Sequence, residues 1–148
     1  MTAPPRRALG VDLGSRRIGL AATDPSGVLA SPVGTVVRHA DRADDHAAIL
    51  AAAREADAAV IVVGLPRSLS GDLGPAAQSV LAEVEELTAR ARAAGIEVET
   101  YDERFTSTIA QQGIREAEVR RGRRRSRRAE VDAAAAAVIL QSWLEARA

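Results

Sequence analysis

The sequence lacks cysteine and lysine, and it has one residue each of phenylalanine, tryptophan and tyrosine. Without cysteine, a disulfide framework, a thiolate zinc site and a cysteine nucleophile are excluded, and a cytoplasmic location is expected. Three aromatic residues disfavour a stacking platform for single-stranded bases. No stretch approaches the roughly 18 continuous apolar residues of a membrane span, so no membrane partner is expected.

The remaining composition is that of a globular chain. With 148 residues and 47% apolar residues, the sequence is long enough to bury a core, and we expect a single domain over residues 1–148. Within it, residues 1–7 are expected to form a flexible tail and residues 118–128 a mobile, arginine-rich loop. The sequence leaves open whether the protein is a monomer or a homodimer.

Charge is unevenly distributed along the chain. The net charge is zero, but residues 115–128 contain eight arginines and two glutamates, a local charge of +6. Such a run is commonly a hydrated arm, but its position directly before an acidic helix favours contact with a phosphate backbone. We expect Arg121, Arg124 and Arg128 to take part. Recognition would then depend on backbone charge and shape, with weak sequence preference and strong salt dependence.

Hydrophobic periodicity predicts an alternating α/β chain. Short turns separate the first three strands, at 8–13, 18–24 and 28–37, which favours an antiparallel meander. Two further strands, at 58–65 and 96–102, are linked by helices and should be parallel. Helices are expected at 41–56, 75–94, 105–118 and 130–146, with Asp41 as an N-cap and Gly95 ending the second. The predicted fold is a mixed five-stranded sheet flanked by helices on both faces.

Acidic residues stand at the edges of three apolar segments. Asp12 closes the first strand, Asp102 and Glu103 close the fifth, and Asp132 opens the alanine-rich last helix. A carboxylate at the edge of a core is costly without a compensating cation, so converging acids suggest a divalent metal site. Asp12 alone could be a turn former, and Asp132 could simply favour a helix N-terminus.

Spacing favours a functional role for one of these acids and leaves another undecided. Positions i+4, i+7, i+8 and i+11 from Asp132 carry apolar residues, so its carboxylate shares the buried stripe of the helix and faces the sheet. Strand alternation places Asp102 and Glu103 on opposite faces. Periodicity therefore does not tell which of the two reaches a shared site.

Four segments stand out in order along the chain: GVDLGSRRIGLAATD (10–24), VVGLPRSLSGDLGPAAQSV (62–80), YDERFTS (101–107) and VDAAAAAVILQSWL (131–144). Together they resemble the YqgF family, also called RuvX, of the RNase H-like superfamily, which includes Holliday-junction resolvases. The resemblance implies an RNase H-like sheet with Asp12, Glu103 and Asp132 as the catalytic and metal-binding acids. It also implies a nuclease that processes the 5′ end of pre-16S rRNA, in contact with RNA and ribosomal precursor particles.

The chemistry that this resemblance implies is phosphodiester hydrolysis assisted by two Mg²⁺ or Mn²⁺ ions, which prefer carboxylate ligands. No histidine lies in a motif, and we expect His39 and His46 on a solvated surface. The family often has lysine or glycine shortly before the helical aspartate, where this chain has Arg128, Ala129 and Glu130. Whether Glu130 or Asp102 joins the metal site stays open.

Four further arginines are candidates for nucleic-acid binding. Arg16 and Arg17 lie in the turn after Asp12, and Arg104 follows Glu103 directly, where it could touch a phosphate or hold a neighbouring carboxylate. Arg67 lies in a loop rich in glycine and serine that could be a substrate gate or a plain connector.

Three alternative functions remain at this point. The family resemblance is compatible with a Holliday-junction resolvase acting on branched DNA. A non-catalytic nucleic-acid-binding factor in ribosome assembly could keep the same fold. The DLGSRRIGLAATD segment also resembles the phosphate-binding hairpin of actin-like kinases, but those enzymes need two such lobes and 148 residues hold one.

Overall fold

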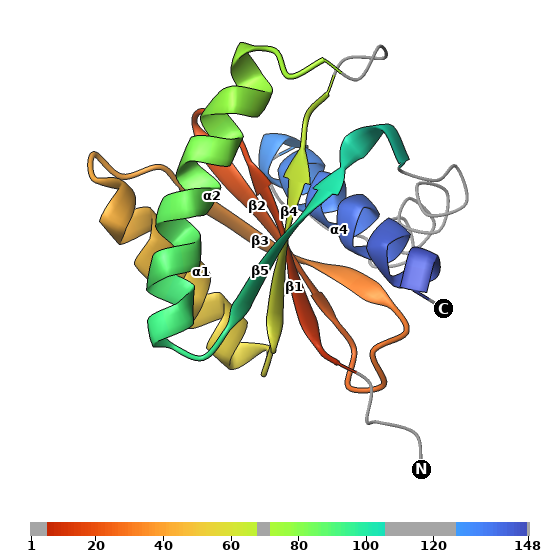
Figure 1. Ribbon diagram of the computed structural model, residues 1–148. Coiled ribbons are helices and arrows are strands. Elements are labelled where there is room, and N and C mark those ends of the chain that lie inside the picture. Colours follow the sequence, from red (N-terminus) through yellow and green to blue (C-terminus); the bar gives the residue numbers. More distant parts are fainter. Residues whose placement is uncertain (1–5, 68–71, 106–126, 148) are drawn as a thin grey trace.

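A five-stranded mixed sheet forms the centre of the protein in the computed structural model, which describes residues 6–67, 72–105 and 127–147 (Figure 1). The strands are β1 (Ala8–Leu13), β2 (Arg17–Thr23), β3 (Ala30–Val37), β4 (Val60–Leu65) and β5 (Glu97–Asp102), in the spatial order β3-β2-β1-β4-β5. The pairs β1 with β2 and β2 with β3 are antiparallel, whereas β4 is parallel to both β1 and β5. The predicted fold class is therefore confirmed.

Helices cover both faces of this sheet. Figure 1 shows α1 (Arg42–Glu55) and α2 (Pro75–Ala93) together on one face and α4 (Arg127–Arg147) on the other. The α1 and α2 face buries alternate strand residues such as Leu9, Val11 and Ile61, and the α4 face buries Val60 and Val62. This alternation follows from the period of two in a strand. Each face of the sheet thus packs against its own apolar cluster.

The last helix lies unusually close to the sheet because glycines replace side chains beneath it. A Cβ atom on Gly10 would come within 2.8 Å of the Ala136 carbonyl oxygen. A Cβ atom on Gly19 would come within 1.9 Å of the Asp132 carbonyl oxygen. Both distances are shorter than any normal contact, so only glycine allows this approach. The helix backbone therefore rests directly on β1 and β2 at these positions.

Element boundaries agree closely with those expected from periodicity. Asp41 accepts a hydrogen bond from the Ala43 backbone at 2.9 Å and caps α1, and Gly95 follows α2 with φ of +75°. Trp143 is 5% exposed, as a core position requires. The short helix η1 (Glu103–Phe105) follows β5 directly. The helix expected at 105–118 and most of the arginine-rich loop lie outside the described residues, and α4 starts at Arg127 instead of Glu130.

A buried polar cluster ties the end of β3 to α1 and α2. Arg38 donates to both carboxylate oxygens of Glu83, at 2.7 and 2.9 Å, and to Asp45 at 3.1 Å. His46 is fully buried, with Nε2 2.9 Å from Glu83 and Nδ1 2.6 Å from the Arg90 guanidinium. The expectation that both histidines are solvated is therefore wrong for His46. Arginine can only donate, so Nδ1 accepts and Nε2 carries the hydrogen.

The pKa values of two carboxylates in this cluster are lowered by hydrogen bonds from neighbouring side chains. Burial alone would raise the pKa of Glu83, but hydrogen bonds from Arg38 and His46 hold it below its ordinary value. Burial opposes ionisation of Asp45 in the same way, and hydrogen bonds from His39 and Arg38 again lower its pKa. The cluster is thus a set of compensated buried charges, which joins three elements.

Candidate acidic site

Asp12 and Asp132 meet where α4 crosses the end of β1. Asp12 pairs with Gly19 across the β1–β2 ladder, so the two residues share one face of the sheet. The backbone of Asp132 lies against Gly19. Since Gly19 has no side chain, the first turns of α4 come down beside Asp12, as the apolar stripe following Asp132 predicts.

Glu103, rather than Asp102, is directed toward this place. Gly64 in β4 leaves space on the α4 face, and Glu103 Oε1 lies 2.9 Å from the point where a Cβ of Gly64 would stand. Asp102 pairs in register with Leu65, on the opposite face. There its carboxylate accepts several hydrogen bonds from Arg104, the shortest at 2.7 Å. The structure thus separates two acids that strand alternation left undecided.

The three carboxylates influence one another electrostatically. Burial raises the pKa of Asp12 above its ordinary value, and the charge of Asp132 raises it further. Burial also raises the pKa of Glu103, followed by the charges of Asp12 and Asp102. By contrast, hydrogen bonds from Arg104 lower the pKa of Asp102. Asp12, Glu103 and Asp132, here called the acidic site, therefore combine partial burial with like charge, which a bound cation would relieve.

The donor chemistry of the acidic site suits Mg²⁺ or Mn²⁺, since both prefer oxygen ligands. Within residues 6–67, 72–105 and 127–147, no group of three histidine, cysteine, aspartate or glutamate side chains is arranged to hold a metal. The Asp132 carboxylate accepts a hydrogen bond from Arg17 Nε at 2.6 Å.

The other expected nucleic-acid-binding arginines are in varied surroundings. Arg16 is exposed in the turn after β1. Arg104 binds Asp102, which favours the salt-bridge interpretation, and Arg67 Nε lies 3.7 Å from the same carboxylate. Arg121 and Arg124 lie outside the described residues, and Arg128 falls in the first turn of α4 with its side chain undescribed. Their contact with nucleic acid stays a prediction.

Two features of this site were not anticipated from the sequence. One is the pairing of Arg17 with Asp132, which are 115 residues apart and share no local pattern. The other is the use of Gly10 and Gly19 to admit α4. Glycine inside a strand commonly marks close approach of another backbone, so these two positions did carry a readable signal.

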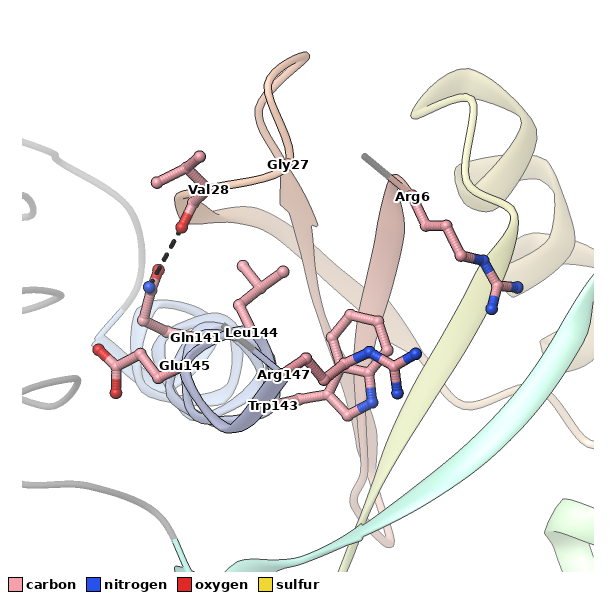
Figure 2. A pocket seen from close by; sticks show the side chains of 8 residues that line it. All are labelled: Arg6, Gly27, Val28, Gln141, Trp143, Leu144, Glu145 and Arg147. Carbon is pink, nitrogen blue, oxygen red and sulfur yellow. Dashed lines mark hydrogen bonds between the residues drawn. The ribbon is translucent and has the colours of Figure 1, made fainter. Parts of the chain in front are cut away.

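A separate pocket lies at the other end of β1. It has a volume of about 430 Å³ and is lined by Arg6, the β2–β3 turn and the end of α4 (Figure 2). Gln141 donates to the Val28 carbonyl at 3.3 Å, and the Arg147 guanidinium lies 4.5 Å from the centre of the Trp143 ring. None of the acidic-site residues lines this pocket.

Among the described helices, none is long and apolar enough to cross a membrane.

Similarity to solved structures supports the same fold. Thermus thermophilus RuvC in complex with a Holliday junction substrate superposes with a TM-score of 0.62 at 20% identity, covering 95% of each chain. The yeast mitochondrial Holliday junction resolvase gives 0.53 at 14% identity, over 95% of this chain and 80% of the other. At these identities the likeness concerns the fold alone.

Sequence similarity is closer. A protein from Mycobacteroides abscessus named "Putative pre-16S rRNA nuclease" is 45% identical over 95% of this chain and 82% of its own length. A Mycobacterium tuberculosis protein of the same name is 46% identical over 95% of this chain and 79% of its own. Residues 6–146 match the family model RuvX, described as Holliday junction resolvase. The chain therefore belongs to the RuvX family.

Proposed function

We propose that this protein is a divalent-metal-dependent nuclease that hydrolyses phosphodiester bonds at the acidic site. The observation that carries the proposal is the gathering of Asp12, Glu103 and Asp132, from three separate elements, at one place on the α4 face of the sheet. Two of these acids have raised pKa values through burial and mutual repulsion. Such an unfavourable cluster is typical of functional sites.

Each acid has a proposed part in holding Mg²⁺ or Mn²⁺. Asp12 is coupled electrostatically to both other acids, and the carboxylates of Asp12, Glu103 and Asp132 would together hold the ions. When bound, the ions would supply an activated water and neutralise charge on the phosphoryl group. Arg16 is exposed beside Asp12 and could hold a flanking phosphate, because a guanidinium binds phosphate oxygens in pairs.

The proposed substrate is the precursor of 16S rRNA, cut at its 5′ end, with ribosomal precursor particles as the setting. Support comes from the names of relatives at 45 and 46% identity that cover nearly the whole chain. A second candidate is cleavage of branched DNA, which the description of the matching family favours. The two differ in substrate and share the acidic site.

The test is cleavage by the purified chain of an RNA carrying the 5′ extension of pre-16S rRNA and of a four-way DNA junction. Activity should require Mg²⁺ or Mn²⁺, and Asp12→Asn, Glu103→Gln or Asp132→Asn should each lower it by about 100-fold or more, because a ligand to the metal is lost. Asp102→Asn, next to Glu103 but bound to Arg104, is the matched control and should retain activity within about tenfold.

Several outcomes would contradict this proposal. Equal cleavage by the native chain and Asp12→Asn would remove the acidic site from the reaction. A greater loss in Asp102→Asn than in Glu103→Gln would exchange their roles. RNA binding without cleavage under any metal condition would favour a non-catalytic assembly factor.

A further inference from the structure

The strongest unexplained contact in the acidic site is between Arg17 and Asp132. Arg17 begins β2, and its Nε lies 2.6 Å from Asp132 Oδ2. The two side chains are 28 and 27% exposed, so the pair is partly shielded from water but not sealed. A basic group therefore already occupies an oxygen of one of the three carboxylates that the proposed function assigns to a metal.

A guanidinium and a divalent cation compete for this carboxylate. The guanidinium and the metal ion both bind the lone pairs of the carboxylate oxygens. Asp132 must therefore give up its hydrogen bond to Arg17 before both of its oxygens can bind a metal ion. Arginine is also well suited to binding phosphate, with donors that match two phosphate oxygens. The neighbouring Arg16 side chain is exposed, so the surface beside Arg17 is open to a polyanion.

We propose that Arg17 is an exchangeable counter-ion: it holds Asp132 while the site is empty and transfers to a substrate phosphate when metal enters. This inference rests on the proposed metal-dependent nuclease function and adds a coupling between substrate and metal. A bound phosphate draws Arg17 away from Asp132, which leaves the carboxylate to the metal ion. A bound metal ion in turn displaces Arg17 from Asp132, which leaves the guanidinium to the phosphate. Binding of a phosphate backbone therefore raises the affinity for metal, and metal raises the affinity for the backbone by the same factor.

A purely structural role makes the opposite prediction. If the Arg17 contact served only to fasten α4 to β2, its removal would loosen Asp132 and weaken metal binding. If Arg17 is a competitor, its removal frees the carboxylate and strengthens metal binding. An increase in affinity is a result that a misfolded or loosened variant does not give.

The first experiment measures Mn²⁺ binding to the full chain by titration calorimetry or by loss of the free-ion electron paramagnetic resonance signal. Arg17→Gln should bind Mn²⁺ about tenfold more tightly than the native chain, within the range usual for coupled sites. Arg17→Lys keeps the competing charge and should stay near the native value. Arg16→Gln is the matched control, because it removes a neighbouring charge without touching Asp132, and should change affinity by less than about threefold.

The second experiment repeats the titration with two oligonucleotides of the same sequence. One has a phosphorothioate backbone, which is charged and resists hydrolysis, and the other a neutral methylphosphonate backbone. In the native chain the charged oligonucleotide should raise Mn²⁺ affinity about tenfold and the neutral one should not. In Arg17→Gln the effect of the charged oligonucleotide should fall to about threefold or less, since the competitor is already gone.

Two failures are distinguishable. If the native chain binds Mn²⁺, Asp132→Asn abolishes this binding, and Arg17→Gln binds no more tightly than the native chain, the exchange is overturned and the metal site stands. If neither the native chain nor Arg17→Gln binds Mn²⁺ saturably, the proposed metal-dependent function is overturned, and the exchange with it.

Discussion

At the residue scale, the acidic site resembles a functional site more than a structural one. Acids in two different situations lie next to each other. Hydrogen bonds from Arg104 lower the pKa of Asp102, whereas burial raises the pKa values of Asp12 and Glu103. A partly buried carboxylate with a raised pKa destabilises the folded state at neutral pH. Such a cost is expected where a charge is kept for its chemistry.

This cost predicts the behaviour of Asp12→Asn without metal. The folded-state pKa of Asp12 lies above its unfolded value, so the folded state binds protons more readily between the two. Stability therefore falls as pH rises through this window, and the full penalty is present above the folded-state pKa. Asn removes this penalty, so the variant should melt at a higher temperature than the native chain at neutral pH.

Thermal melting in EDTA from neutral to acidic pH measures this difference, which should shrink as the pH falls toward the unfolded-state value. Added Mg²⁺ should stabilise the native chain and not the variant. A variant that melts below the native chain at neutral pH would show that the Asp12 charge is not a burden.

At the element scale, the position of α4 decides whether the acidic site exists. Its first turns approach β2 only because position 19 has no side chain, and Asp132 is carried there with the helix. Stability and function are coupled at this contact. A bulkier residue would have to push α4 away from the sheet and Asp132 away from Asp12.

Gly19→Ala tests this coupling. Its Cβ would lie 1.9 Å from the Asp132 carbonyl oxygen, and backbone there has little freedom to yield. We expect a loss of about 2–3 kcal/mol in the free energy of unfolding, in the range found for overpacked cores. Denaturant unfolding measures it, with Gly74→Ala as control: no atom lies within 4 Å of its added Cβ, so only a capping loss of about 1 kcal/mol or less is expected. Equal losses in both would contradict the steric account.

Periodicity and turn residues were sufficient to predict the elements that lie within the described residues, but they did not predict the contacts between distant elements. The apolar stripe after Asp132 predicted which way its side chain faces, and Asp41 and Gly95 marked helix ends correctly. Alternation placed Asp102 and Glu103 on opposite faces but could not say which face α4 covers. That choice depends on the packing of α4, which begins 24 residues after Glu103.

The same limit explains the error on His46. It lies in a helix with little amphipathic pattern, and its partners Glu83 and Arg90 come from another helix. A histidine that is flanked in the sequence by charged residues and alanines is predicted to be exposed to solvent, because the sequence does not reveal its partners on another helix. Ion pairs formed across elements leave no periodic trace in the sequence, and the Arg17 contact with Asp132 was missed for the same reason.

At the scale of the whole molecule, zero net charge conceals a separation of signs. Residues 115–128 carry +6 and the rest of the chain −6, and the last two residues of this basic stretch begin the helix that holds Asp132. A polyanion would be drawn toward the basic stretch and thus to the neighbourhood of the acids. The free energy of binding a nucleic acid should then come mainly from the release of counter-ions from its phosphate backbone.

This layout predicts a steep salt dependence. The affinity for an RNA duplex should fall by about 10³-fold between about 50 and 200 mM salt if some six phosphates are neutralised. Replacing Arg121 and Arg124 by glutamine should reduce the slope of log affinity against log salt by about 2, one for each lost phosphate contact. Fluorescence anisotropy of a labelled duplex measures both, with the exposed Arg54→Gln in α1 as control. An unchanged slope in the double variant would exclude this stretch from the interface.

The turn that follows Asp12 is anchored from behind. Arg38 donates from Nε to the Gly14 carbonyl at 2.9 Å while its terminal nitrogens hold Glu83 in α2. One guanidinium thus joins the turn between β1 and β2, which bears Arg16, to α1 and α2 on the opposite face of the sheet. Damage to the Arg38 contacts with Glu83 would consequently shift the Gly14 turn and, with it, the Asp12 carboxylate on the α4 face of the sheet.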